Sequence, residues 1–494
     1  MKQIEILIFF VFVLAFSSCK KFLDVNPDNR AEIDNVEKLA KLVGTAYPQY
    51  GYLAMAEMYS DNVGDKGPQA PGTHTNNPYP QLYKWEDVKE EGNNTPTQYW
   101  NGVYEGIAAA NQALDAATND IFGKAADPYK GEALIARAYG HFMLVTFFAK
   151  AYEPGGSNSS PGIPYVLAPE TVPVVKYSRG TVASVYEQIE KDLEEGISLL
   201  AGGHWDVPKY HFTPAAAHAF AARFYLFKGE WQKVIDHANK IFPGGDFKGN
   251  IRDFNGEALN IAVSEEYRRW WNNGDQKFNI MLHETYSVYQ RSSSFGTSRF
   301  GFTRTIYNQS NGNTAAGKNF NWRAWTTGGT DNLILYKYFE YFHYTNVTAG
   351  IGYPYIMMPL FTADEALMNR AEAYAQLGQL DNAIKDCNLF ATTRILDYNP
   401  TTHAVTVAKS KTFFNVTDDK EAIIKTVLDF KKRAFLTEGL RWFDILRHKI
   451  TVKHNFLDAD GEETFIELGP EDNRRMFQIP EQATKLSDVE PNPR

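Results

Sequence analysis

A chain of 494 residues is long enough for two or more sub-structures, or for an elongated array of elements. Its hydrophobic fraction of 44% and charged fraction of 22% are those of an ordinary folded protein, and 14% of its residues are aromatic. The net charge is −9 and no dense block of lysine and arginine is present, so nucleic acid is not an expected partner.

The first 18 residues are predicted to form a lipoprotein signal peptide. Lys2 precedes an apolar run from 6 to 16, which would span about 16 Å as a helix, against a hydrocarbon core of about 30 Å. That length suits a secretory signal and not a permanent membrane span. Two serines then lead to Cys19 in a pattern that resembles a bacterial lipobox, with Phe16 in the place of the usual leucine. We therefore expect Cys19 to carry the lipid anchor.

Four helical hairpins are predicted along the mature chain, which runs from 19 to 494. Apolar residues recur at helical spacing in segments that pair in chain order: 36–50 with 99–117, and 129–149 with 183–200. Two further hairpins, 221–241 and 370–390, repeat each other in sequence. The hairpins are not in tandem, because long insertions separate them, unlike the repeats of a regular solenoid.

The two repeated segments follow the tetratricopeptide pattern of a helix, a tight turn and an antiparallel helix. Both place a glycine, Gly229 or Gly378, at the turn, where a positive φ can end a helix. The remaining thiol, Cys387, falls at a small position of the second helix and is predicted to be a buried hydrophobic residue. With only two cysteines in the chain, structural disulfides are not expected.

Two long insertions are predicted to carry the function. The larger runs from about 251 to 359 and is rich in Ser, Gly, Asn and aromatic residues, and the smaller runs from 59 to 98. Loops of this length in a folded domain are usually functional or mobile. We expect minor β-structure in them but find no strong hairpin signal. The predicted fold class is therefore mostly α, with four tetratricopeptide-like hairpins and loop-rich insertions.

Three segments together resemble the SusD/RagB family of outer-membrane nutrient-binding lipoproteins. They are the start after the anchor, CKKFLDV at 19–25; the segment KRAFLTEGLRWFDILRHK at 432–449; and the ending FQIPEQATKLSDVEPNPR at 477–494. The cluster Arg441-Trp442-Phe443-Asp444 lies in the second segment. The family resemblance and its helical spacing both indicate an architectural role, with Glu438, Arg441 and Asp444 pairing locally.

The resemblance implies a non-catalytic protein on the outer surface of the outer membrane. It would bind a glycan or a related nutrient and deliver it to a TonB-dependent transporter of the SusC/RagA type. Two alternatives stay open: a tetratricopeptide adaptor that binds other proteins, and a surface glycosidase that uses carboxylates of the large insertion. The candidate carboxylates would be Glu265, Glu266, Asp275 and Glu284.

No cofactor or metal site is expected. His204, His211 and His218 are seven residues apart, and the sequence has no HExxH or paired CxxC motif. Asp61, Asn62 and Asp65 could offer oxygen ligands to calcium, but their spacing matches no EF-hand loop. Serine-hydrolase and nucleotide-binding motifs are also missing.

Aromatic side chains in the insertions are the predicted ligand contacts. An aromatic ring stacks on the C–H face of a sugar, while amides and charged groups bind its hydroxyls. The alternative for each ring is a place in the insertion's own small core. The predicted binding residues are Trp270, Trp271, Tyr286, Tyr289, Trp322, Trp325 and, at the end of the smaller insertion, Trp85.

Overall fold

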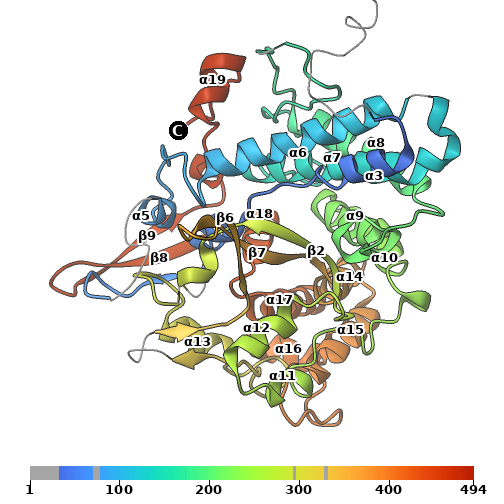
Figure 1. Ribbon diagram of the computed structural model, residues 1–494. Helices are drawn as coiled ribbons and strands as arrows, with labels where there is room; N and C mark the ends of the chain where they lie inside the picture. Colours follow the sequence, from blue (N-terminus) through green and yellow to red (C-terminus); the bar gives the residue numbers. More distant parts are fainter. Residues whose placement is uncertain (1–32, 71–77, 119, 173, 293–295, 327–331) are drawn as a thin grey trace, which may run out of the picture.

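The computed structural model of the protein describes residues 33–70, 78–118, 120–172, 174–292, 296–326 and 332–494 (Figure 1). The predicted signal peptide and the predicted anchor Cys19 lie outside the described residues. None of the helices in these ranges is long and apolar enough to cross a membrane.

Helices make up most of the fold, as predicted. The described helices are α3 (Val36–Val43), α4 (Leu53–Tyr59), α5 (Tyr79–Tyr83), α6 (Pro96–Ala116), α7 (Asp127–Phe148), α8 (Val182–Leu199), α9 (Pro214–Lys228), α10 (Trp231–Ala238), α11 (Glu257–Asn260), α12 (Ser264–Asn272), α13 (Arg304–Ser310), α14 (Ala363–Gln376), α15 (Leu380–Thr392), α16 (Val407–Phe414), α17 (Asp419–Ala434), α18 (Leu440–Arg447) and α19 (Glu481–Ser487).

The described strands form four small sheets. They are β1 (Gly64–Asp65) with β3 (Phe300–Gly301), β2 (Asn279–Tyr286) with β7 (Ile351–Thr362) and β6 (Glu340–Asn346), β4 (Trp325–Thr326) with β5 (Leu333–Ile334), and β8 (Val452–Leu457) with β9 (Glu463–Leu468). All of these pairings are antiparallel, and the β2-β7-β6 sheet is the one that matters for the site.

The four predicted hairpins correspond to helix pairs that contact each other: α3 with α6, α7 with α8, α9 with α10, and α14 with α15. Helix α3 stops at Val43, so the segment that follows it, to residue 50, is not helical as predicted. The α9–α10 and α14–α15 turns contain Gly229 with φ 72° and Gly378 with φ 74°, the left-handed conformation that the repeat pattern predicts. In Figure 1, α3, α6, α7 and α8 form a layer along the top of the view, above α9 and α14.

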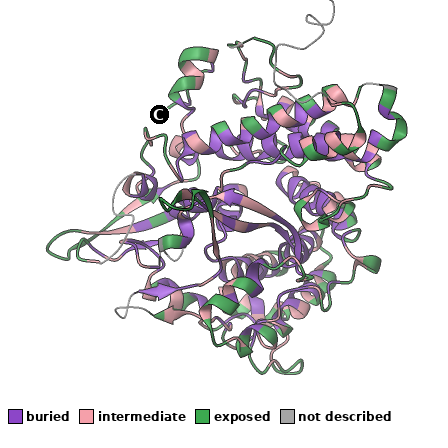
Figure 2. Ribbon diagram, in the orientation of Figure 1, coloured by how far each residue is buried: buried purple, intermediate pink, exposed green. Residues whose placement is uncertain are grey.

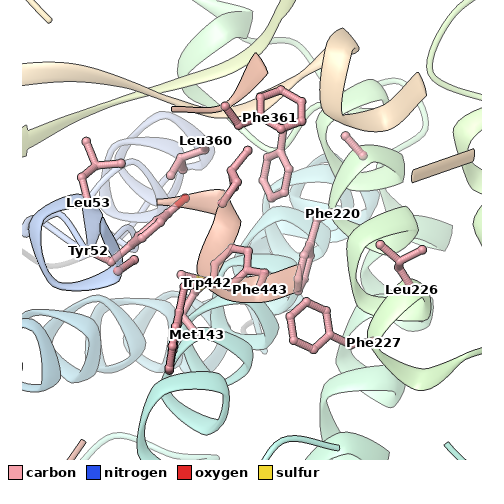
Figure 3. Packing of buried hydrophobic residues seen from close by; sticks show 14 of the residues in the cluster. Tyr52, Leu53, Met143, Phe220, Leu226, Phe227, Leu360, Phe361, Trp442 and Phe443 are labelled. Carbon is pink, nitrogen blue, oxygen red and sulfur yellow. The ribbon is translucent and has the colours of Figure 1, made fainter. Parts of the chain in front are cut away.

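The core joins segments that are far apart in the sequence. Buried residues concentrate where the helices meet the central strands (Figure 2). Trp442 is fully buried against Tyr59, with 5.3 Å between the ring centroids, and Phe443 lies 5.8 Å from Tyr52. Figure 3 shows side chains from α4, α7, α9, β7 and α18 converging there. The Arg-Trp-Phe-Asp segment therefore has the architectural role that its helical spacing predicts.

The charged neighbours of that segment pair over long distances, which corrects the expectation of local pairing. Arg441 donates to Asp61 at 2.8 Å, a residue of the smaller insertion. Glu438 accepts from Lys337 at 2.7 Å and from Arg252 at 3.1 Å, two residues of the large insertion. Only Asp444 pairs within its own helix, with Arg447 at 2.7 Å. The ion pairs of Asp61 and Glu438 therefore connect both insertions to the C-terminal part of the chain.

A buried carboxyl beside this network makes stability depend on pH. Glu57 is 2% exposed and accepts a hydrogen bond from the Gly439 amide at 2.8 Å. Burial raises the pKa of Glu57 to about 7, so the folded state favours its protonated form. Its contribution to stability is therefore fully present below about pH 4.5 and is lost as the pH rises through 7.

We expect Glu57→Gln to raise the free energy of unfolding at pH 8 by about 2 kcal/mol, because the amide resembles the protonated acid at every pH. The gain should shrink toward pH 5. Denaturant titrations of the variant and the wild type at pH 5 and pH 8 measure both values. The exposed Glu187→Gln on α8 is the control, and an equal gain for Glu57→Gln at both pH values would contradict the assignment.

Candidate functional site

Five of the seven predicted ligand contacts lie in the core, which corrects the sequence-based interpretation. Their exposed fractions run from 0% to 7%, which leaves no ring face free for a sugar to stack on. These five are Trp85, Trp270, Trp271, Tyr289 and Trp322.

The contacts of these rings explain their burial. Two cations contact Trp271, with the Arg252 guanidinium 3.9 Å and the Lys337 ammonium 4.3 Å from its ring centroid. The Trp322 indole donates to the Arg433 carbonyl at 2.7 Å, and Trp85 stacks on His454 at 4.4 Å. The buried rings of the large insertion therefore belong to the main core of the protein rather than to a small core of the insertion.

Trp325 and Tyr286 are the two predicted contacts that keep part of their rings in solvent. Trp325 is half-buried on β4, with 5.3 Å between its ring centroid and that of Tyr336 and with the Arg323 guanidinium 5.0 Å away. Tyr286 ends β2 and belongs to a much larger group of rings.

That group covers one face of the β2-β7-β6 sheet. The register pairs Tyr286 of β2 with Tyr355 of β7, and pairs Tyr355 with Tyr341 of β6. His343 of β6 opposes Tyr353 of β7 in the same way. Directly opposed residues share a face of a sheet, so these rings form one surface. We call the six rings the tyrosine platform: Tyr50, Tyr286, Tyr341, His343, Tyr353 and Tyr355.

Tyr286 contacts three other rings of the platform edge to face. The centroid of Tyr286 lies 5.8 Å from that of Tyr353, 5.8 Å from that of Tyr355 and 5.9 Å from that of Tyr50. His343 lies 4.6 Å from Tyr355. Tyr353 is 52% exposed, and the others are exposed or half-buried. The rings hold one another in place while parts of them stay in solvent.

The opposite face of the sheet anchors the platform. Thr285, Ile356 and Met358 point away from the rings and are 0–2% exposed. Alternation along the strands therefore puts an apolar face on the core and an aromatic face outward. In Figure 1, β6 and β7 lie in the middle of the view, between α6 above and α12 below.

The segment between α3 and α4 supplies the ring of Tyr50. The Tyr286 amide donates to the Gln49 carbonyl at 2.8 Å, and Tyr50 forms a parallel bridge with Tyr286. The Tyr50 ring lies directly on Gly102 of α6, where a Cβ would come within 2.1 Å of its Cδ2 atom. Only glycine leaves room there, so α6 is shaped to receive this ring.

Polar groups surround the platform. Asn93 donates to the Tyr286 hydroxyl at 3.1 Å and accepts from Gln98 at 3.2 Å. Burial, followed by the charge of Glu105, raises the pKa of Tyr50, and burial with the charge of Glu284 raises that of Tyr355. Both phenols therefore stay protonated at neutral pH and can donate as well as accept hydrogen bonds.

The sequence contains a signal for this surface that the loop-rich interpretation misses. Aromatic residues alternate with other residues in YPYIM at 353–357, which is the period of a half-exposed strand, and the segment YFHY at 341–344 is aromatic throughout. The turn between the strands includes Gly350 with φ 67°. Tyrosines two residues apart in the large insertion indicate this pair of strands, whereas its tryptophans are mostly residues of the core.

The other residues considered for metal binding have partners of their own. Asp61 pairs with Arg441 and Lys432, and Asp65 pairs with Arg299 at 2.8 Å. His204, His211 and His218 contact Asp206, Glu132 and His237 respectively and do not converge. Within the described ranges no group of three or more His, Cys, Asp or Glu could hold a metal ion. Cys387 is fully buried, and burial raises the pKa of its thiol, as expected of a core residue.

Hollows in the described part of the chain also lie away from the platform. One, of about 190 Å³, is lined by serines and ion pairs, and in it Lys449 joins Glu153 and Glu471 at 2.9 and 3.3 Å. Another, of about 620 Å³, lies beside α17.

A further hollow, of about 260 Å³, is a groove between α6 and α19 that is partly aromatic, with Trp100, Tyr104 and Tyr177 in its lining. Trp100 is only 5% exposed and packs on Tyr104 with 4.9 Å between the ring centroids. The rings of this groove are therefore less open to a sugar than that of Tyr353, which is 52% exposed.

The fold and the site together define a class of protein, in which a scaffold of helical repeats carries an open aromatic surface with polar groups at its edge. The chain belongs to the SusD family. The model of that family matches residues 238–488, just over half of the chain, and a model described as starch-binding associating with outer membrane matches residues 21–226.

Solved structures share the fold at low sequence identity. A SusD superfamily protein from Bacteroides thetaiotaomicron VPI-5482 is 17% identical, with a TM-score of 0.64 over 93% of this chain and 100% of that chain. A SusD-like carbohydrate binding protein from Bacteroides vulgatus ATCC 8482 is 15% identical, with a TM-score of 0.63 over 92% of this chain and 97% of that chain. A comparison with curated proteins finds no match.

Proposed function

We propose that this protein captures a glycan at the cell surface without cleaving it and passes it to a TonB-dependent outer-membrane transporter of the SusC/RagA type. Cys19 would carry the lipid that holds it to the outer membrane, facing outward. The mature chain from 19 to 494 would act as one nutrient-binding unit.

The tyrosine platform is the observation that carries the proposal. It offers adjacent ring faces for the C–H surface of a sugar, together with the phenol hydroxyls, Asn93 and Gln98 for the sugar's hydroxyl groups. Tyr286, predicted from sequence as a ligand contact, is at its centre, with three rings within 6 Å of its own centroid. We also propose that Trp325 contacts the glycan, at a second place separate from the platform.

Family membership and the platform's chemistry support capture over the two alternatives. SusD-like relatives include a chain named as a carbohydrate binding protein. A glycosidase needs an acid and a second carboxylate across the bond, and of the four candidate acids Glu284 alone lies on the platform, where it pairs with His343. An adaptor would use an apolar groove for a peptide, for which the surface between α6 and α19 is the place to look.

We expect Tyr353→Ala to weaken retention of the bound glycan about tenfold, because it removes the most open tyrosine of the platform at little cost to the fold. Affinity electrophoresis through gels that contain a range of polysaccharides measures the retention, and assays for reducing ends measure turnover. Phe465→Ala on β9 is the matched control, since that ring is also 52% exposed and lies on another hairpin.

The outcomes separate the candidate functions. Retention that depends on Tyr353, without product, supports capture. Release of sugar by the purified wild type would establish a glycosidase instead. If no polysaccharide retains the wild type, or if Tyr353→Ala binds as well as Phe465→Ala does, the platform is not the glycan site.

A further inference from the structure

Two carboxylates lie beside the tyrosine platform. Glu105 of α6 is exposed and lies one turn after Gly102, the residue on which the Tyr50 ring packs. Glu284 of β2 is 39% exposed and contacts His343 at 3.0 Å. The two charges also contribute to the raised pKa of Tyr50 and of Tyr355, respectively. Tyr210 is 40% exposed and belongs to the short helix 208–210, which packs against β2.

The basic groups beside the platform are engaged by oxygen atoms of the protein itself. His343 contacts Glu284 at 3.0 Å. Arg291 forms a two-pronged ion pair with Glu340, at 2.7 and 3.1 Å, and its guanidinium lies over Phe342 on the other face of β6. The ammonium group of Lys209, in the turn that precedes Tyr210, donates to backbone carbonyls of 276 and 279.

We infer that the platform selects uncharged glycan chains and rejects chains that carry carboxylate or sulfate groups. This inference rests on the proposed function. An anionic sugar placed on the rings would bring its charge next to Glu105 and Glu284, and the neighbouring arginine and histidine already face carboxylates. Like charges at such distances repel, and a desolvated anion without a partner is costly. Specificity then comes from repulsion as well as from stacking.

Uncharged sugars meet no such barrier. Carboxylates accept hydrogen bonds from sugar hydroxyls, so Glu105 and Glu284 favour a neutral ligand through the same groups that repel an anion. The protonated phenols of Tyr50 and Tyr355 add donors that suit the oxygen atoms of hydroxyl and ring ether groups. The arrangement therefore fits polymers of neutral hexoses or pentoses.

Affinity electrophoresis of the mature wild-type chain at low salt tests the inference. Gels contain either neutral polysaccharides, such as starch, β-glucan, mannan and arabinoxylan, or the polyuronates polygalacturonate and alginate. We expect retention by at least one neutral polymer and at least about tenfold weaker retention by both polyuronates. Higher salt should narrow the difference, because it screens the repulsion.

Charge-removing variants identify the source of the selectivity. Glu105→Gln and Glu284→Gln, combined, should increase the ratio of polyuronate retention to neutral-polymer retention at least about threefold at low salt, because the repulsion of anions is lost. Glu187→Gln, exposed on α8 away from the platform, is the matched control and should leave that ratio unchanged. An unaltered preference in the double variant would overturn the role of these two carboxylates.

The inference and the proposed function fail in different ways. Retention of the wild type by a polyuronate as strongly as by a neutral polymer, with loss of both in Tyr353→Ala, would overturn the selectivity and leave glycan capture standing. Retention by none of the polymers would overturn the proposed function, and the inference with it.

Discussion

Replacing Glu438 by alanine is expected to lower the free energy of unfolding by about 3–5 kcal/mol, because it removes the carboxylate that two buried cations share. Glu438 is 6% exposed and accepts from the Lys337 ammonium at 2.7 Å and from the Arg252 guanidinium at 3.1 Å. Both cations are also almost completely buried, at 0% and 1%. Denaturant unfolding followed by circular dichroism at pH 7.5 measures the loss.

Two controls keep the result specific. Glu421→Ala removes an exposed carboxylate from α17 that pairs with Lys425 one turn away, and should cost at most about 0.5 kcal/mol. Glu438→Gln keeps the shape and one acceptor oxygen, so we expect a loss between those of the two alanine variants. A Glu438→Ala protein as stable as Glu421→Ala would show that the buried network does not hold the insertion.

The position of Glu438 explains why a family-typical segment surrounds it. The residue precedes α18 in the sequence EGLRWFD, and its two cations come from the large insertion, about 100 and 190 residues away along the chain. The insertion carries β2, β6 and β7, and so carries the platform. The segment thus fixes the frame on which the aromatic surface is built, without touching the ligand itself.

Local signals in the sequence were sufficient for the scaffold. The helical hairpins follow from apolar spacing, and Gly229 and Gly378 mark two of their turns, since each of these features is set within one or two helical turns. Cys387 is buried as its place in the repeat predicts. The site was harder, because β2 and β7 pair across about 70 residues and no local pattern specifies that register.

Residue type was a poor guide to exposure in the large insertion. Tryptophan has the largest apolar surface, so it gains most from burial, and Trp271 is accordingly fully buried in the core. Tyrosine has a hydroxyl that can stay in water while its ring packs on a neighbour, so tyrosines cover the outward face of the sheet. The sequence predicted a binding surface made of rings, but only Tyr286 of the predicted set belongs to the platform.

Trp271→Ala tests this distinction directly, and we expect it to lower the free energy of unfolding by about 3–5 kcal/mol. The indole is fully buried, and its removal would leave a cavity next to Phe254 and would deprive Arg252 and Lys337 of a ring that both contact. Denaturant unfolding measures the loss. Trp325→Ala is the matched control from the same insertion, and because its ring is half-buried we expect a loss below about 1.5 kcal/mol.

The same pair of variants separates a core role from a ligand role. Affinity electrophoresis at a temperature where Trp271→Ala remains folded should give glycan retention equal to that of the wild type, because the platform does not include Trp271. Wild-type stability combined with lost retention would reverse the assignment and return Trp271 to the binding surface. The ring is fully buried and contacts two buried cations, so it has no open face for a ligand and we expect its effect to fall on stability alone.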